Sequence, residues 1–488
     1  MHSGRDIPDV PAHDVRVGVD DWVAEHEERR VRRAGLVGAF DRALAYVPAP
    51  ARLALFAAFA TTLPLWMNRG DLFVYGIITL VYLLLALGLN VVVGYAGLLD
   101  LGYIAFFGVG AYVYALLSSE HYGVHWPATA TIPVVVVSTA VLGLVLGIPS
   151  RRLLGDYLAI VTLFFGQAFV AFTNAAGQDV AGENLTGGPN GIADIDALGF
   201  FGYEFASRTQ QFYFLLGVAV LVLAALYLLS ESRTGRAWRA LREDPLAAET
   251  MSMPVNRLKL LAFMFGAGIA GLAGCIFAAV LTAVTPGIFG LPLLITIYAV
   301  VILGGLGSLT GVVLGAIVVN VSFQFLAPEN PQDNARLLFY AVLVLLLVLG
   351  LRPWWRVGAV LGSVAVLGVV TVAVVDAVAP SWSGGPVVEG GRFASVVEDW
   401  VLIPSGHDRF GDWAYVTLVV AILGLTLLRG WVRTVALVPT LYLAALVWEN
   451  SFVNEPAVAR WILFGSLLVF LMGVRPQGLL GTPRVEIV

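Results

Sequence analysis

The sequence predicts an all-α fold, a polytopic helical bundle embedded in a membrane. Hydrophobic residues make up 59% of the 488 positions and charged residues only 12%, which is more apolar surface than a soluble domain of this length can bury. Long apolar runs recur along the chain, and Lys and Arg are concentrated in alternate connections between them. Together these observations indicate an integral membrane protein.

About ten apolar runs form a predicted core bundle, and about four more follow toward the C-terminus. Several are shorter than the roughly twenty residues that a span needs, so one or two of them can be re-entrant segments. The core runs cover 51–67, 72–93, 101–117, 131–148, 157–173, 211–229, 260–283, 291–305, 311–327 and 336–351. The later runs cover 357–379, 413–428, 432–448 and 459–474.

The distribution of positive charge predicts that both termini lie in the cytoplasm. With that orientation, 22 of the 28 Lys and Arg residues fall on inner segments. The first thirty residues carry charges of both signs and predict no secretory signal peptide. Helical spacing of apolar residues between 36 and 47 favours an interfacial helix, although an amphipathic linker gives the same pattern.

Four regions are predicted on this basis. Residues 1–50 form a cytoplasmic arm with the interfacial helix, and 51–353 form the membrane core with a coupling loop at 232–259. Residues 354–459 form an extra transmembrane block with an outer loop at 380–412, and 460–488 form a final span and a cytoplasmic tail. The spans of the extra block hold almost no polar residues deep inside, so we expect the block to pack at the periphery against lipid.

One hydrophilic stretch, Ser232–Lys259, which we call the arginine island, separates two long apolar runs. Four arginines at three-residue spacing lie on one side of a predicted short helix: Arg233, Arg236, Arg239 and Arg242. Asp244 and Pro245 predict the start of a second helix, because Asp caps a helix N-terminus and Pro lacks the N–H that the first turn does not use. That helix, about two turns long and ended by Pro254, is too short to be stable alone, so we expect it to dock.

The second helix of the island is predicted to be a coupling helix that fits a groove on a cytoplasmic motor subunit. Its small apolar surface includes Leu246. The alternative is a positively charged loop that only fixes the topology. The residues assigned to coupling are Arg242, Glu243, Asp244, Pro245, Ala247, Ala248, Glu249 and Met251.

Two glycine-rich interruptions, at 94–102 and 304–311, lie within apolar stretches. A broken helix leaves backbone groups unpaired unless protein or a water-filled cavity satisfies them, and a freed helix N-terminus suits a substrate carboxylate. Paired breaks in two halves of a chain indicate a transport site. The predicted translocation path comprises Gly94, Tyr95, Gly97, Asp100, Gly102, Tyr103, Thr162, Gln167, Gly304, Gly305 and Ser308.

Each of these features also has a simpler explanation. Asp100 is an acid within the membrane region, which suggests function, but it lies near the predicted inner face and can act as a helix cap. Thr162 and Gln167 can serve only as hydrogen-bonding links between helices. Three glycines at four-residue spacing are typical of close helix packing: Gly307, Gly311 and Gly315.

The first long outer loop, 174–210, is rich in Gly, Asn and Asp and is predicted to dock a receptor. Within it, Asp194-Ile195-Asp196 also matches the D-x-D motif of metal-dependent membrane glycosyltransferases, which leaves a membrane enzyme as an alternative. The residues assigned to docking are Asn184, Thr186, Pro189 and Asn190.

Residue usage argues against several kinds of chemistry on this chain. The only lysine, Lys259, does not lie in a phosphate-binding loop, so any ATP and Mg²⁺ would bind partner subunits and no cofactor is expected here. The single cysteine, Cys275, excludes an internal disulfide. All six histidines fall outside the apolar runs, so neither a membrane metal site nor a histidine proton relay is expected. An external motor is therefore favoured over a secondary transporter.

Two segments near the C-terminus are similar to each other. Arg336–Pro353 and Arg460–Pro476 each run from an Arg through an apolar span to Arg-Pro. The similarity favours a duplicated span, although any Leu-rich span with a basic end gives a similar pattern.

Several stretches in order resemble the LivM-type permease of branched-chain amino-acid ABC importers. The resemblance covers about 70–353 and the last few tens of residues, whereas 354–459 have no counterpart. The matching stretches are Gly88–Gly97 (G-L-N-V-V-V-G-Y-A-G), Leu101–Tyr112, Gly155–Leu163, Thr186–Gly191, Arg242–Asp244 with Ala247–Glu249, Gly304–Ser308 and Arg475–Gly481. The chain departs from the family at Phe164 and Ser252, where Gly is common, at Gln167, where an acid is common, and at Val312, where Pro is common.

The resemblance implies a permease subunit that does no covalent chemistry and resides in the bacterial cytoplasmic (inner) membrane. It implies a second, LivH-like permease, two cytoplasmic ATPase subunits and an extracytoplasmic substrate-binding protein. Substrate would move by alternating access driven by ATP. The alternatives are a urea or short-amide permease of the same superfamily and an ion-coupled carrier that acts alone.

Overall fold

The structure is a computed structural model that describes residues 49–150, 155–177, 184–200, 203–325, 334–350, 355–380, 382, 399–404, 410–428 and 430–454, and parts of 461–480. It has two compact units, Met1–Ala60 and Thr61–Val488. The predicted N-terminal arm, the basic pair at 151–152, both Arg-Pro dipeptides and most of the loop 380–412 lie outside the described residues.

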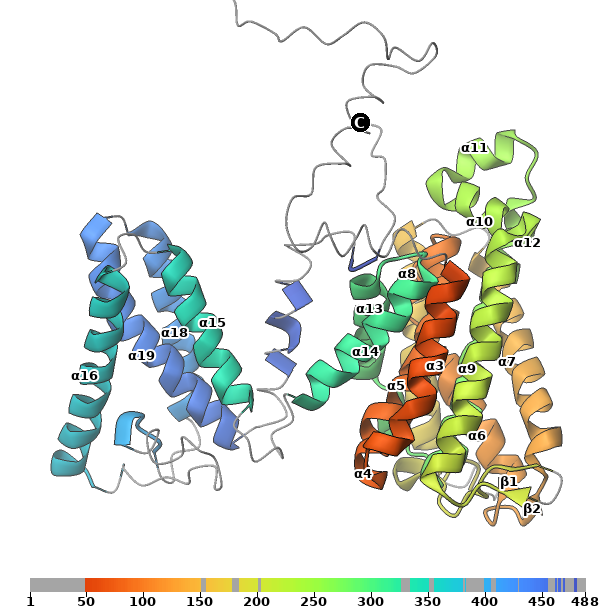
Figure 1. Ribbon diagram of the computed structural model, residues 1–488, viewed down its shortest axis with the longest axis horizontal. Coiled ribbons are helices and arrows are strands. Elements are labelled where there is room, and N and C mark those ends of the chain that lie inside the picture. Colours follow the sequence, from red (N-terminus) through yellow and green to blue (C-terminus); the bar gives the residue numbers. More distant parts are fainter. Residues whose placement is uncertain are drawn as a thin grey trace, which may run out of the picture. The chain divides into compact units, whose positions relative to one another are not determined.

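Each predicted apolar run with described residues falls on helix, which confirms the all-α polytopic fold (Figure 1). Seven of the described helices are long and apolar enough to cross a membrane. Helix α3 (Ala49–Trp66) crosses the boundary between the two units. The helices of the core are α4 (Arg69–Asp71) continuing through η1 (Leu72–Ile77), α5 (Ile78–Leu89) and η2 (Asn90–Tyr95), α6 (Tyr103–Leu117), α7 (Ala128–Ser150), α8 (Gly155–Ala175), α9 (Arg208–Glu231), α12 (Val255–Leu281), α13 (Leu291–Gly304) and α14 (Leu309–Phe325).

Helix α12 is the centre of the core, because it packs along α5, α6 and α7. Small residues permit this close approach. A Cβ on Gly271 would lie 2.1 Å from the Thr139 hydroxyl oxygen of α7, and one on Gly274 would lie 2.0 Å from the Phe107 carbonyl oxygen of α6. In a membrane, where burial of apolar surface between helices gains little, such backbone proximity and its van der Waals contacts hold helices together.

Two π-helical segments interrupt the long helix 69–95. A π-helix shifts the backbone hydrogen-bonding register, and it occurs frequently at functional sites. The first segment, η1, is tied to α14 by Asn320, whose amide nitrogen donates to the Val74 carbonyl (2.9 Å) and to the Thr79 hydroxyl (2.7 Å). The second, η2, begins at Asn90, which is buried, and leads into the first glycine-rich interruption.

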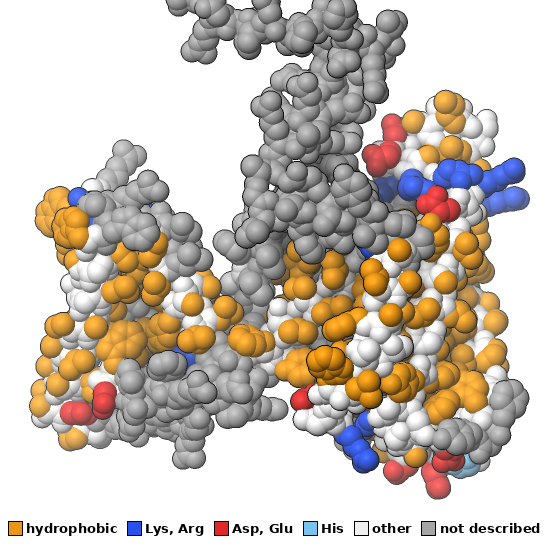
Figure 2. All heavy atoms as spheres, in the orientation of Figure 1, with side chains coloured by type: hydrophobic (Ala, Val, Ile, Leu, Met, Phe, Trp, Pro, Cys, Tyr) orange, Lys and Arg blue, Asp and Glu red, His pale blue; other side chains and the backbone are white. Residues whose placement is uncertain are grey.

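The core has charged ends and an apolar surface between them (Figure 2). At one end lie the two short helices of the arginine island, α10 (Arg233–Glu243) and α11 (Pro245–Thr250). At the other end lie two short hairpins, β1 (Ser118–Ser119) with β2 (Val124–His125) and β3 (Gly199–Phe200) with β4 (Tyr203–Glu204). We call these the island end and the hairpin end.

The later helices build a hydrophobic core of their own. Helices α15 (Asn334–Gly350), α16 (Trp355–Val378) and α19 (Gly430–Asn454) contribute to it, with α18 (Phe410–Leu427) and the segment 400–403. Arg336 of α15 forms a buried ion pair with Glu449 of α19, and Phe339 stacks on Trp448. Thus α15 packs with the extra block, so the packing boundary lies before residue 334, whereas the sequence-based boundary lies after 353.

The start of the final span packs against the core helix α14. Trp461 and Phe464 make edge-to-face contacts with Phe323, at ring-centroid distances of 5.0 and 5.7 Å. Of the two similar segments, the second therefore lies beside α14 and the first lies in the extra block. Of the described helices, α15, α16, α18 and α19 lie between α14 and this final span in the sequence.

Candidate functional site

The arginine island is built as the sequence predicts, with one helix leading into a shorter one. The Asp244 carboxylate accepts hydrogen bonds from the backbone N–H of Leu246 (2.8 Å) and Ala247 (3.0 Å), and Pro245 occupies the first helical position. This confirms the predicted cap. Helix α11 ends at Thr250, earlier than Pro254 requires, because Ser252 adopts a left-handed conformation with φ of 60°.

Helix α10 is fixed to the bundle by its apolar face. Trp238 is fully buried and its indole N–H donates to the Leu258 carbonyl of α12 at 2.8 Å. On the opposite face, Arg236 and Arg239 are exposed and donate to the Glu231 and Ser230 carbonyls at the end of α9. Cationic side chains near a helix C-terminus satisfy its last carbonyls and complement its dipole.

The residues of α11 divide into an exposed and a buried set. Leu246 is 75% exposed and Met251 77% exposed, and Ala247 and Glu249 are also exposed. Ala248, by contrast, is only 4% exposed because it packs within this chain. The apolar surface that α11 offers to another molecule therefore excludes Ala248, which the sequence assigned to it.

The two glycine-rich interruptions meet at the island end. Gly307 donates its backbone N–H to the Asn90 side-chain oxygen at 2.8 Å, and a Cβ on Gly94 would lie 2.7 Å from the Gly307 nitrogen. Arg242 of α10 donates to the Gly94 carbonyl. We call this cluster the glycine junction: Asn90, Gly94, Gly97, Arg242, Gly305 and Gly307. The sequence analysis assigned no role to Asn90. A polar amide just before a glycine-rich break could have indicated one, because such a side chain can bond the backbone of a broken helix.

Tight turns explain the glycines of the second interruption. Gly305 and Gly307 have φ of 112° and 81°, which favours Gly. Gly304 and Gly311 face each other, and a Cβ on either would lie within 2.4 Å of the other's carbonyl oxygen. The Ser308 hydroxyl accepts from the Gly311 N–H at 3.1 Å at the start of α14. Close packing of α13 on α14 thus accounts for Gly304 and Gly311.

The C-terminal tail, at 478–480, binds the backbone at the start of the turn between α13 and α14. The N–H groups of Leu479 and Leu480 donate to the Leu303 and Gly304 carbonyls, at 2.7 and 3.1 Å. These carbonyls belong to the last turn of α13, where the helix offers no internal donors. Gly478, with φ of 78°, approaches so closely that a Cβ would lie 2.7 Å from the Gly305 backbone.

Asp100 and Thr162 hold the first interruption to α8. Asp100 is buried, and one of its carboxylate oxygens accepts from the Gly102 N–H at 3.0 Å, immediately before α6. The Thr162 hydroxyl accepts from the Leu101 N–H at 2.9 Å. A Cβ on Gly102 would lie 2.2 Å from the Thr162 carbonyl oxygen. The Thr162 contact matches the simpler explanation of a link between helices, whereas Asp100 closes a local turn onto Gly102 and does not cap α6 itself.

The remaining predicted path residues lie in different surroundings. Tyr103 is fully buried, and its hydroxyl donates to the Leu85 carbonyl at 2.9 Å, so it joins α6 to α5. Tyr95 is also buried. Gln167 lies on an exposed face of α8 and contacts neither interruption through a described hydrogen bond; Phe164 on the same face is 70% exposed.

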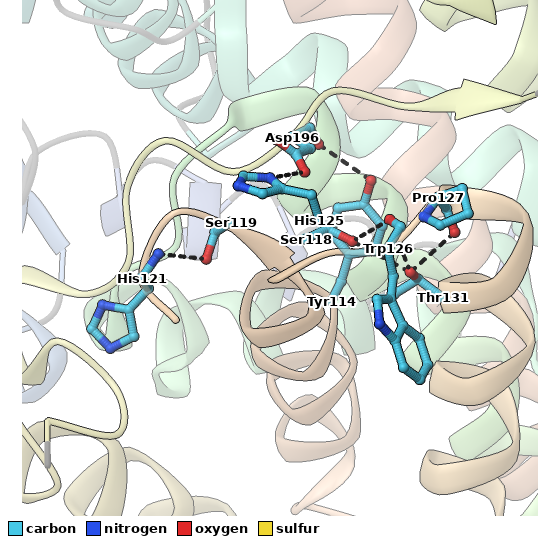
Figure 3. Close-up of polar contacts among 9 residues, drawn as sticks. All are labelled: Tyr114, Ser118, Ser119, His121, His125, Trp126, Pro127, Thr131 and Asp196. Carbon is cyan, nitrogen blue, oxygen red and sulfur yellow. Dashed lines mark hydrogen bonds and ion pairs between the residues drawn. The ribbon is translucent and has the colours of Figure 1, made fainter. Parts of the chain in front are cut away.

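At the hairpin end, the β1–β2 hairpin and the 184–200 segment are bound together (Figure 3). Asp196 donates its N–H to the Ser118 carbonyl at 2.8 Å, and its carboxylate pairs with His125 Nδ1 at 2.8 Å. The hydrogen bond and the charge of Asp196 raise the pKa of His125 above its ordinary value. The Asn184 carbonyl accepts from the Tyr122 hydroxyl and contacts the His121 ring.

Three of the four residues assigned to docking are exposed, namely Asn184, Pro189 and Asn190. Thr186 is buried, and its hydroxyl donates to the Thr173 carbonyl of α8 at 2.7 Å, so it attaches the loop to that helix. Within the D-x-D motif, Asp196 pairs with His125, Ile195 is buried and Asp194 is exposed with φ of 54°. Among the described residues, no three acidic, His or Cys side chains are grouped to hold a metal ion.

Comparison with known proteins agrees with the resemblance. The chain is 35% identical over 325 residues to the high-affinity branched-chain amino acid transport system permease protein LivM of Salmonella typhimurium, covering 61% of this chain and 73% of that protein. LivM of Escherichia coli is also 35% identical, over 62% of this chain and 75% of its own length. LivH of Salmonella typhimurium is 24% identical, over 55% of this chain and 88% of its own length. No solved structure matches the chain.

Residues 53–347 match the family described as "Branched-chain amino acid transport system / permease component". That range includes the first glycine-rich interruption, the arginine island and the second interruption. The relatives are permease components of transporters, and the apolar helices make this an integral membrane protein. The chain belongs to the family of permease components of branched-chain amino acid transport systems.

Proposed function

We propose that this chain is one of two permease subunits of an ATP-driven importer for branched-chain amino acids. The observation that carries the proposal is the form of the island end. The six-residue helix α11, begun by the Asp244 cap, presents Leu246 to the surroundings, and Met251, directly after it, is also exposed. Exposed apolar side chains on a rigid short helix fit a groove on a partner protein.

The partner at the island end is a pair of cytoplasmic ATPase subunits. We expect ATP and Mg²⁺ to bind there; the only lysine of this chain, Lys259, lies in no phosphate-binding loop, which is consistent with that division. Closure of the ATPase pair moves α11, and the membrane helices then reorient around the substrate in alternating access. This chain transmits force and does no covalent chemistry.

The second permease, LivH-like, faces the exposed side of α8. Gln167 lies on that face next to Phe164, within a helix apolar enough to cross the membrane. An amide turned toward lipid is unfavourable because hydrocarbon offers it no hydrogen-bond partner. A partner permease or the substrate path between the two chains relieves that cost. The apolar side chains around Gln167 suit a substrate with a hydrophobic side chain.

In this proposal the protein lies in the bacterial inner membrane with the island end in the cytoplasm, and the hairpin end faces an extracytoplasmic substrate-binding protein. Exposed Asn184, Pro189 and Asn190 supply the docking surface. Their loop is held rigid by the Thr186 and Asp196 contacts, and preorganised loops lose less entropy on binding.

Purification of the tagged chain from native membranes, followed by reconstitution into liposomes, tests the proposal. Nucleotide-binding subunits should copurify, and with the binding protein present the liposomes should take up labelled leucine, isoleucine or valine only with ATP on the island side. Unlabelled urea in excess is the specificity control and should not compete. Uptake without ATP, or a preparation lacking ATPase subunits that still transports, would contradict the proposal.

A further inference from the structure

Arg242 differs from the other arginines of α10 in where its side chain goes. Arg233, Arg236 and Arg239 are exposed, whereas Arg242 is half-buried and turns from the helix toward the glycine junction. It lies one turn after Trp238, the residue that fixes α10 to α12. Helix α10 thus has an anchored side chain and, next to it, a cation that enters the bundle.

The first contact of Arg242 is with the interruption at 94–102. Its Nη1 donates to the Gly94 carbonyl, at the end of the π-helical segment η2. Its aliphatic stem lies on Gly97, where an added Cβ would be 2.9 Å from Arg242 Cγ. Gly97 has φ of 71°, so the turn needs glycine both for its backbone and for the space that Arg242 fills.

The second contact is with the turn between α13 and α14. An added Cβ on Gly307 would lie 2.9 Å from Arg242 Nη1 and 3.2 Å from the Gly94 carbonyl oxygen. Gly307 also donates to Asn90 in the η2 segment. One guanidinium group therefore lies where the two glycine turns meet.

We propose that Arg242 is the positioning residue through which movement of the island reaches both glycine turns. The proposal rests on the proposed function, because it assumes that a motor moves α11. A guanidinium that donates to a part-buried carbonyl is a strong, directional contact. A shift of α10 about its Trp238 anchor pulls the Gly94 carbonyl and changes the space beside Gly307. The turns of α13–α14 and of 94–97 then move together.

Two variants of Arg242 separate this role from simple packing. Arg242→Met keeps an unbranched stem against Gly97 and removes every donor, while Arg242→Lys keeps one charged donor. Arg233→Met is the matched control, since it removes an exposed arginine of the same helix. For each reconstituted complex, the rate of ATP hydrolysis and the rate of amino-acid uptake are measured together, and the readout is substrate moved per ATP hydrolysed.

We expect Arg242→Met to lower substrate moved per ATP by about tenfold, the effect of losing one charged hydrogen bond, with hydrolysis retained. Arg242→Lys should recover part of the ratio, and Arg233→Met should match the wild type. An unchanged ratio in Arg242→Met overturns the proposal. So does an equal fall of uptake and hydrolysis, or loss of both Arg242 variants from the membrane, because each assigns Arg242 to packing or folding.

A second measurement needs no transported substrate. Leu306 lies half-buried in the α13–α14 turn, and the single native cysteine, Cys275, is buried. In Leu306→Cys complexes, the rate of thiol labelling should change on addition of ATP with vanadate, and adding Arg242→Met should abolish that change. Persistence of the change with Arg242→Met overturns the proposal. A Leu306→Cys complex with native Arg242 that moves no branched-chain amino acid, yet shows the ATP-dependent labelling, contradicts the proposed substrate and leaves the role of Arg242 supported.

Discussion

Arg336 on α15 and Glu449 on α19, 113 residues apart in sequence, form a buried ion pair in which the Arg336 Nε lies 3.1 Å from both carboxylate oxygens. Tyr340 adds a hydrogen bond to Glu449 at 3.0 Å. Because both charged side chains are excluded from solvent, removing one partner leaves the other charge uncompensated.

Glu449→Gln should therefore destabilise the extra block by about 3–5 kcal/mol, and the second substitution Arg336→Met should restore most of the loss. Gln keeps an acceptor for Tyr340, and Met removes the guanidinium, so the double variant leaves no unpaired charge. The unfolding free energy in a denaturing-detergent titration measures the effect. Equal stability of the single and double variants would show that the two charges are not coupled.

Removal of residues 334–459, joining 333 to Arg460, should give a chain that inserts and assembles. This deletion takes out α15, α16, α18 and α19, an even number of the described helices, and so should keep the final span in its orientation beside Phe323. Deletion of 354–459 is the matched control, because it removes only three of these four described helices and should reverse the final span. Protease protection of a C-terminal tag reports the orientation. A reversed tag in the longer deletion would contradict the expectation that these four helices cross the membrane an even number of times.

Leu246→Arg should lower the amount of copurified ATPase by about tenfold or more without affecting insertion, because a charge cannot enter an apolar groove unpaired. Ala248→Arg makes an instructive comparison. Ala248 is buried within the chain, so this variant should reduce accumulation in the membrane as well. Normal ATPase recovery with Leu246→Arg would remove α11 from the interface.

The orientation of the hairpin end is tested with Asn184→Cys. Asn184 is exposed and should react with a membrane-impermeant thiol reagent in intact spheroplasts. Glu243→Cys, at the island end, should react only after the membrane is opened. The reverse pattern would invert the proposed topology. Buried Cys275 provides the background.

The His125–Asp196 pair should depend on pH. The carboxylate raises the pKa of His125, so the charged pair is complete below the ordinary pKa of histidine and is lost as the pH rises through the raised value. In Asp196→Asn, the pH midpoint for modification of His125 by diethyl pyrocarbonate should fall. Peptide mapping by mass spectrometry follows this residue separately from the other histidines. An identical midpoint would mean that the pair does not persist in the membrane.

Local rules were sufficient where the structure depends on neighbouring residues. The Asp244–Pro245 start of α11 and the apolar runs follow from capping chemistry and from hydropathy. The burial of Ala248 could not be predicted from the sequence, because tertiary contacts decide which side of a six-residue helix is buried. The burial of Thr186 could not be predicted either, since only the fold brings its hydroxyl to the Thr173 carbonyl.

The extra block shows a different limit. The two Arg-to-Arg-Pro segments that flank the block are both strongly apolar, so no sequence rule tells which packs beside α14 and which pairs with α19. The family match extends to residue 347 and thus includes α15, while Phe323 contacts the second segment. In the sequence, Glu449 directly follows the apolar run 432–448, and only the packing identifies Arg336 as its partner.

The contact of Leu479 and Leu480 with the end of α13 also has a consequence for biogenesis. The ribosome delivers these residues long after Leu303 and Gly304 have entered the membrane, with the whole extra block synthesised in between. Until then, the carbonyls at the end of α13 lack these two donors. These hydrogen bonds therefore form only after the extra block has been synthesised, so they are a late step in the assembly of the second glycine turn.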